Sequence, residues 1–293
     1  MSTTNTTSGN WQFNLDNIMY IVNSFLSYSS IMLNIVAIHA LRKTLSLPTT
    51  LKTLLLSLAV SDLGVGLLVQ PWRIAGLAMG LLQHDGRPNF TVYIAYKITM
   101  NVFYYASFLG VMVLAVERFL AIHLHLRYQR LVTHKRVVTI VISLWVISVF
   151  LSLFMLEIRK VRLVIYTTVE VLCLISTALL FFKIYLTVRR HSRQIQSIQP
   201  AGGQNSVSRK KTSAVATLYV YLVFLACYLP QNCLQIASIS HGSQDTLYDN
   251  FEIYTLTLVF LNSSLNPLIY CWKMKQIRKA ILNVLRNMNP RHN

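Results

Sequence analysis

Seven long apolar stretches constrain the fold of this chain more than any other feature of its sequence. They lie at about residues 18–41, 50–77, 92–122, 136–156, 163–188, 213–240 and 247–271. Each is long enough to cross a bilayer, which takes about 20 apolar residues in an α-helix. Because backbone polar groups in lipid must be paired within the segment, such stretches form helices. We therefore predict an all-α membrane protein, a seven-transmembrane helix bundle with its two ends on opposite sides.

The basic residues gather on one side of these spans. The net charge is +18, and 21 of the 27 Lys and Arg residues lie in segments 41–52, 118–136, 183–211 and 273–293. Since Lys and Arg concentrate in cytoplasmic segments, the N-terminus is predicted to be extracellular. Of the nine acids, Glu117 is placed at the inner face, Asp62 within the membrane and the other seven outside, Glu170 and Glu252 among them. The charge thus indicates orientation and contact with anionic membrane lipids, and no nucleic-acid partner is expected.

The spans divide the chain into three parts. Residues 1–17 form a polar extracellular tail, residues 18–271 the membrane domain, and residues 272–293 an amphipathic helix and a cytoplasmic tail. The alternative for the last part is an ordinary solvated basic tail. Asn5-Thr-Thr and Asn89-Phe-Thr match the glycosylation acceptor pattern, with Asn5 favoured because Asn89 lies close to the third span. All four cysteines fall in or at the end of apolar spans, so no disulfide is predicted.

The last span contains the pair Asn266-Pro267, and both residues are costly in a membrane helix. Proline removes a backbone hydrogen bond and bends the helix, while asparagine needs a polar partner where water is scarce. They stand in the run Leu265-Asn-Pro-Leu-Ile-Tyr270. This pattern favours a membrane protein with a movable, polar interior.

Further motifs stand in order along the other spans: Asn34 in the first, Leu58-Ala-Val-Ser-Asp62 in the second, Glu117-Arg118-Phe119 at the end of the third, Trp145 in the fourth and Cys227-Tyr228-Leu229-Pro230 in the sixth. With these motifs and Asn266-Pro267 in the seventh span, the chain resembles the rhodopsin-like (class A) family of G-protein-coupled receptors over about residues 20–285. The resemblance implies a plasma-membrane receptor that transmits the binding of an extracellular ligand to a heterotrimeric G protein. It implies no enzymatic activity.

Asp62 is an ionisable residue near the middle of the membrane, where charge is expensive and usually functional. The resemblance implies a sodium pocket around it, made of Asp62, Ser107, Asn262, Ser263 and Asn266. These residues offer oxygen ligands, which suit a hard cation. A sodium ion acting as an allosteric modulator is the one possible cofactor. A purely structural polar network that joins the helices is the alternative.

The resemblance also implies an activation switch, in which Arg118 is released from Glu117 and meets the G protein. The other switch residues it implies are Phe108, Tyr185, Phe224, Tyr228, Pro230, Pro267 and Tyr270. Ordinary aromatic packing is the alternative explanation for the rings. By resemblance, Leu126 enters the G-protein groove. By resemblance, many relatives hold this arginine with an acid at the inner end of the sixth span. Here the basic stretch Arg209-Lys210-Lys211 stands at that place and repels Arg118, so we expect a loose inner contact and basal signalling.

The outer half departs from the family pattern. The disulfide to the second outer loop is missing, that loop is very short, and Thr177 stands near the usual proline of the fifth span, as in the melanocortin receptors. Met100 replaces the amine-binding acid, which disfavours a biogenic amine. By matching, the ligand cavity is lined by Trp72, Arg73, Lys97, Met100, Asn101, Tyr104, Gln231, Gln235, Glu252 and Leu256. Arg73 and Lys97 favour an acidic small molecule, a lipid or a peptide. Contact with lipid headgroups explains these two cations equally well.

Two further functions stay open as alternatives. The first is a receptor-like protein that does not signal or is constitutively active. The second is a transporter, which would show repeated halves or charges along several helices; the sequence shows neither.

Overall fold

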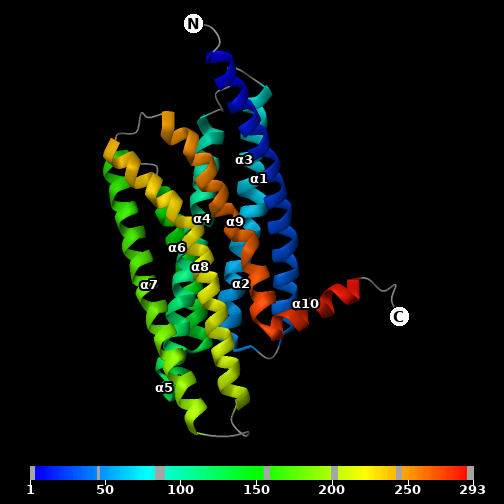
Figure 1. Cartoon of the computed structure of the whole chain (residues 1–293), viewed down its shortest axis with the longest axis vertical. Coiled ribbons are helices and arrows are strands. Elements are labelled where there is room, and N and C mark those ends of the chain that lie inside the picture. The colour runs from blue at the N-terminus through cyan, green and yellow to red at the C-terminus, as the bar shows by residue number, and fades with distance from the viewer. Residues whose placement is uncertain are drawn as a thin grey trace.

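The computed structural model of the chain describes residues 4–44, 47–82, 90–154, 159–198, 204–241 and 246–288. The long helices run up and down beside one another as a bundle (Figure 1). They are α1 (Thr4–Lys43), a second helix divided into α2 (Thr49–Gly64), η1 (Val65–Val69) and α3 (Gln70–Leu82), and then α4 (Phe90–His123), α6 (His134–Phe154), α7 (Arg159–Ile198), α8 (Gln204–His241) and α9 (Thr246–Lys273). Two shorter helices, α5 (His125–Leu131) and α10 (Lys275–Met288), lie at the end of the bundle opposite the N-terminus.

A helix is present at each of the seven predicted spans, and the second span is formed jointly by α2, η1 and α3. Six spans are long and apolar enough to cross a membrane by length and composition, namely Asn17–Lys43, Thr49–Gly76, Phe90–His123, His134–Phe154, Leu163–Thr187 and Leu218–Ser240. The seventh, α9, has 28 residues and is long enough, but polar side chains from Asn262 to Asn266 lower its hydropathy. The helix α1 begins at Thr4, so its backbone continues through most of the predicted tail.

Apolar side chains face both the interior of the bundle and its outside. Inside, Leu55, Leu114 and Phe224 are fully or almost fully buried. Outside, large apolar side chains such as Phe150 on α6 and Leu172 on α7 are more than half exposed. Continuous apolar exposure on this scale is unfavourable in water and is what a lipid environment requires.

Small residues let the second span pack closely against its neighbours. A Cβ atom at Gly64 would lie 2.0 Å from the Phe103 ring, so α4 approaches there only because the side chain is absent. The Ser27 hydroxyl donates to the Gly66 carbonyl over 2.9 Å. The π-helical turn η1 follows directly, and such turns interrupt α-helices mostly at functional positions. This turn lies three residues beyond Asp62.

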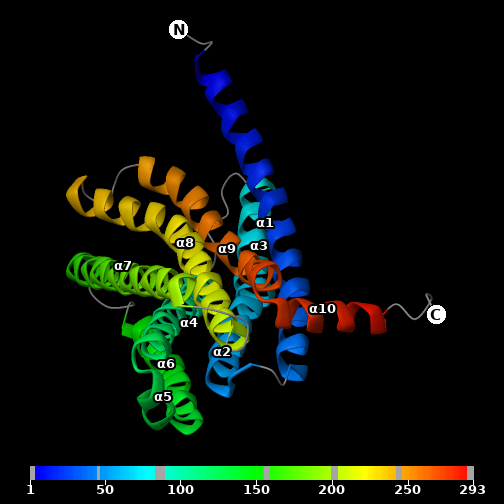
Figure 2. The same ribbon diagram turned by 60° about the horizontal axis from the view of Figure 1, so that its bottom comes forward.

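The amphipathic helix predicted after the seventh span is present as α10. Figure 2 shows it leaving the bundle sideways at the end of α9. Its apolar residues Ile277 and Ile281 are buried, whereas Leu282 is exposed. A helix with this division and with Lys275, Arg278 and Lys279 on it is suited to lie along a membrane surface.

Candidate functional site

A cluster of polar side chains lies at the C-terminal end of α4, which is predicted to be the inner end, and we call it the inner latch: Glu117, Arg118, Tyr128 and Thr50. The Arg118 guanidinium donates two hydrogen bonds of 2.5 Å to the Glu117 carboxylate. Both residues are buried. The Tyr128 hydroxyl, on α5, also donates to Glu117, and it lies 3.1 Å from the Thr50 hydroxyl on α2. The latch thus ties α4 to α5 and α2.

Tyr128 remains a hydrogen-bond donor throughout the physiological pH range. Burial raises the pKa of its phenol to about 12, helped by the negative charge of Glu117 and by the hydrogen bond to that carboxylate. The phenol is therefore neutral near pH 7 and can share the carboxylate with Arg118.

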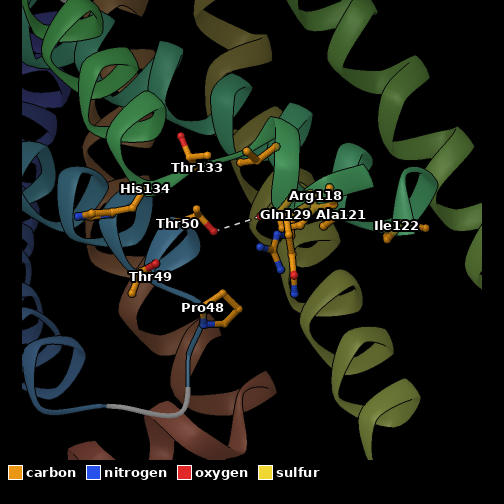
Figure 3. Close-up of a pocket in the computed structure, with 11 residues that line it drawn as sticks. Pro48, Thr49, Thr50, Arg118, Ala121, Ile122, Gln129, Thr133 and His134 are labelled. Atoms are coloured by element: carbon orange, nitrogen blue, oxygen red, sulfur yellow. Dashed lines mark hydrogen bonds between the residues drawn. The ribbon is translucent and has the colours of Figure 1, made fainter. Parts of the chain in front are cut away.

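A cavity of about 520 Å³ lies beside the latch. Figure 3 shows Arg118, Gln129 and Ile122 on one side of it and Pro48, Thr49 and His134 on the other. The wall thus combines α2, α4, α5 and the start of α6. Among the described lining residues, Arg118 is the only lysine, arginine or acid. Arg118 is buried, and it forms part of the wall of this hollow.

The predicted sodium pocket is assembled around Asp62, whose side chain is fully buried. The Asn266 amide donates to the carboxylate over 2.8 Å, and the Ser107 hydroxyl donates over 3.5 Å. Ser263 also hydrogen-bonds the carboxylate. Asn262 is buried as well, but its amide makes no hydrogen bond within the described part of the chain.

The residues present fit a small hard cation. Carboxylate, hydroxyl and amide oxygens are all at hand, and the side-chain oxygens of Asn262 and Asn266 are buried without a hydrogen-bond partner among the described residues. A cavity of about 10 Å³ is lined in part by two members of the set, Ser107 and Ser263. That is about the smallest space that holds one water or one ion.

The aromatic switch residues form one stack in the middle of the bundle. The Phe224 and Tyr228 rings are 4.2 Å apart at their centroids, and Phe108 lies 5.5 Å from Phe224. Pro230 and Pro267 lie inside α8 and α9. Two predicted members are separate from this stack.

Those two residues are the tyrosines Tyr185 and Tyr270. Tyr185 is 47% exposed on the outside of α7. Tyr270 is buried, and its hydroxyl has no partner among the described residues. The structure therefore places neither of these two rings in the aromatic stack.

The predicted ligand residues are arranged in two layers. In the outer layer Lys97 lies 3.6 Å from Glu252, Trp72 packs against Tyr96, and Arg73 and Asn101 are partly exposed. In the deeper layer Met100 and Leu256 belong to one buried cluster. The remaining members bond to neighbouring helices, Gln231 to Thr255 over 2.5 Å and Gln235 to Thr167 over 3.2 Å.

Glu170 was expected outside the membrane, and this placement is wrong. The residue lies within the apolar part of α7 and is buried against Tyr104, whose hydroxyl donates to it over 3.3 Å. Its position inside span 163–188 was the available signal. The contact with α4, 66 positions away in sequence, was not visible from spacing.

Sequence reasoning also missed a contact between α8 and the end of α9, which we call the cation–π clasp: Tyr219, Trp272 and Lys273. The Lys273 amine lies 3.9 Å from the Tyr219 ring centroid and 3.5 Å from that of Trp272. All four cysteines are free thiols. The side chains of Asn5, Leu126, Arg209, Lys210 and Lys211, and the whole of Asn89, lie outside what the structure describes.

Comparison with known proteins agrees with this arrangement. The family model described as 7 transmembrane receptor (rhodopsin family) matches residues 33–179 and 158–270. Similar relatives include the adenosine receptor A3 of Ovis aries, 24% identical over 96% of this chain and 93% of the relative. The melanocortin receptor 5 of Bos taurus is 27% identical over 89% of this chain and 82% of the relative.

Proposed function

This chain belongs to the rhodopsin family of seven-transmembrane receptors, and we propose that it signals by releasing Arg118 from the inner latch. As a G-protein-coupled receptor of the plasma membrane it binds an extracellular ligand and activates a heterotrimeric G protein. In our proposal the N-terminus is extracellular and the latch faces the cytoplasm.

The observation that carries the proposal is the position of Arg118. Its guanidinium is held by Glu117 within one helix and at the same time forms part of the wall of the 520 Å³ cavity. A ligand that binds one conformation more tightly shifts the population toward it. The conformation required here is one in which α8 moves about Pro230 and Arg118 becomes available to the G protein, with Leu126 as a second contact.

Sodium has a place in this proposal as a stabiliser of the resting conformation. Asp62, Ser107, Ser263 and Asn266 would hold the ion, which would supply the positive charge that the buried carboxylate lacks. Helix packing supports this, because the Ser30 hydroxyl donates to the Asp62 carbonyl and the Asn34 amide donates to the Ser263 carbonyl. The pocket walls are thereby fixed to α1.

The ligand has to be inferred from this chain's own residues. The relatives are named for adenosine and for melanocortin at comparable identity, so their names give no single answer. An acidic small molecule, a lipid or a peptide was predicted from Arg73 and Lys97. Glu252 already compensates Lys97, which leaves this prediction resting on Arg73.

Arg118→Ala tests the proposal in cells. We expect surface expression to stay near that of the wild type and G-protein activation to fall to background, because no other charged guanidinium lines the inner cavity. The measurement is a G-protein dissociation panel without ligand and with candidate ligands. Lys135→Ala is the matched control, since Lys135 is exposed near the cavity but does not line it. Persistent coupling of Arg118→Ala would contradict the switch assignment, and no coupling of the wild type to any subtype under saturating ligand would favour a non-signalling receptor.

A further inference from the structure

Glu170 is a buried acid without a compensating cation among the described side chains. It is only 4% exposed. The ion pairs in this part of the chain are Glu117 with Arg118 and Lys97 with Glu252, and Glu170 belongs to neither. A carboxylate inside a membrane bundle is costly unless it is paired and hydrogen-bonded. The single hydrogen bond from Tyr104, 3.3 Å long, is modest compensation.

The surroundings of Glu170 are rich in aromatic rings. Tyr104 is the centre of a cluster in which its ring lies 5.1 Å from Tyr228, 5.4 Å from Tyr105 and 6.3 Å from Phe108. Ring faces attract cations, most strongly where water is excluded. A carboxylate at the edge of this aromatic cluster, where the Tyr104 hydroxyl meets it, is therefore suited to a positively charged group.

A second unsatisfied acceptor lies at the same depth. The side-chain oxygen of Asn232 is buried and has no hydrogen-bond partner within the described residues. The contact of Thr167 with Gln235 marks the level above Glu170, and the bond from the Tyr221 hydroxyl to the Leu174 carbonyl marks the level below. Between these two levels α8 presents Tyr228 and Asn232, one turn apart.

We propose that Glu170 is the counter-ion for a protonated amine of the ligand, with Tyr104 and Tyr228 against the cation and Asn232 accepting one of its N–H bonds. The inference rests on the proposed receptor function, and it identifies the ligand as cationic, in place of the acidic ligand predicted from Arg73 and Lys97. It places the amine contact on α7 rather than on α4, where Met100 offers no acid. Because the bond between Thr167 and Gln235 closes the layer above, the ligand has to open that contact to enter.

The test uses three probes of one size and three charges: phenethylamine, phenethyl alcohol and hydrocinnamate. Each is added at millimolar concentration to the purified full-length receptor, and the melting temperature is measured. We expect the amine alone to raise it. In Glu170→Gln, which keeps the shape and removes the charge, binding of the amine is expected to weaken at least about tenfold, as for other buried charge pairs.

Asp249→Asn removes an acid of α9 on the predicted outer side that is not in the predicted ligand set, and it distinguishes a specific contact from a general loss of negative charge. We expect it to keep most of the amine effect. The proposal is overturned if the amine does not stabilise the wild type, if the alcohol or the acid stabilises it equally, or if Glu170→Gln and Asp249→Asn lose the effect to the same extent. The melting temperature reports binding alone. An amine that raises it without activating a G protein would therefore count against the proposed signalling function and not against the counter-ion.

Discussion

Three acids are buried in the described part of this bundle, and they are compensated to different degrees that suggest what each one does. Glu117 has a full cation, Arg118, and a tyrosine hydroxyl. Asp62 has an amide and hydroxyl groups but no described cation. Glu170 has one tyrosine hydroxyl. Because a buried carboxylate is costly until it is paired, the acid with an internal cation is suited to holding the protein in one state. The other two are suited to binding something from outside.

Removing the charge of Asp62 tests this reasoning for the sodium pocket. We expect sodium chloride to raise the melting temperature of the purified wild-type receptor relative to choline chloride at the same ionic strength. A ligand present at about ten times its dissociation constant stabilises by about 1.4 kcal/mol, which corresponds to a few degrees in a chain of this size. Asp62→Asn keeps the shape of the side chain and should lose this difference. An equal effect of sodium on both proteins would mean that the ion acts elsewhere and that the polar network is structural.

At the scale of the helices, α8 and the C-terminal end of α9 are joined by the cation–π clasp on the predicted inner side. Arg209, Lys210 and Lys211 provide no acid to hold Arg118, and on that ground basal signalling was predicted. The clasp supplies a different restraint, since Tyr219 of α8 packs 5.4 Å from Trp272 with the Lys273 amine close to both rings. An outward movement of α8 has to separate Tyr219 from this lysine.

Tyr219→Leu removes the ring from the clasp, and we expect ligand-free G-protein activation to rise. A partly exposed cation–π contact contributes about 1 kcal/mol, which is about a fivefold change in the population of the signalling state. Lys273→Gln should have a similar effect. The double variant should exceed neither single variant by much, because residues that act as one unit are not additive. Additive effects, or a fall in basal activity, would show that the clasp does not restrain α8.

Hydropathy was sufficient to locate every membrane helix, because lipid forces long apolar stretches to be helical. It could not show the π-helical turn at Val65–Val69. A helical turn that is wider by one residue needs no change in the apolar pattern of the sequence. The set around Asp62 came from resemblance, and most of it is in contact with Asp62. The contacts of Glu170 and Tyr219 depend on which face of α7 and α8 points inward. Neither helix has a clear polar face, so periodicity gave no answer there.

For the whole molecule, the number of crossings decides on which side each end lies. Six helices satisfy the apolar length criterion within the described residues, and α9 carries more polar groups. Those polar groups are inside the bundle, since Asn262, Ser263 and Asn266 are buried, while Phe251 and Leu268 are exposed on the outside of α9. A helix with its polar side chains facing inward can cross lipid, so we expect seven crossings.

Epitope tags at the two ends measure this directly. In intact cells we expect antibody to label a tag placed before Met1, while a tag after Asn293 is labelled only once the membrane is permeabilised. The physical reasons are the odd number of crossings and the 21 basic residues in the predicted inner segments, which favour the cytoplasmic side. A tag in the segment 199–203, between α7 and α8, is the internal control and should behave like the C-terminal one. Labelling of both ends on the same side would mean that α9 does not cross, and the inner latch would then have to be assigned to its side of the membrane from the internal tag alone.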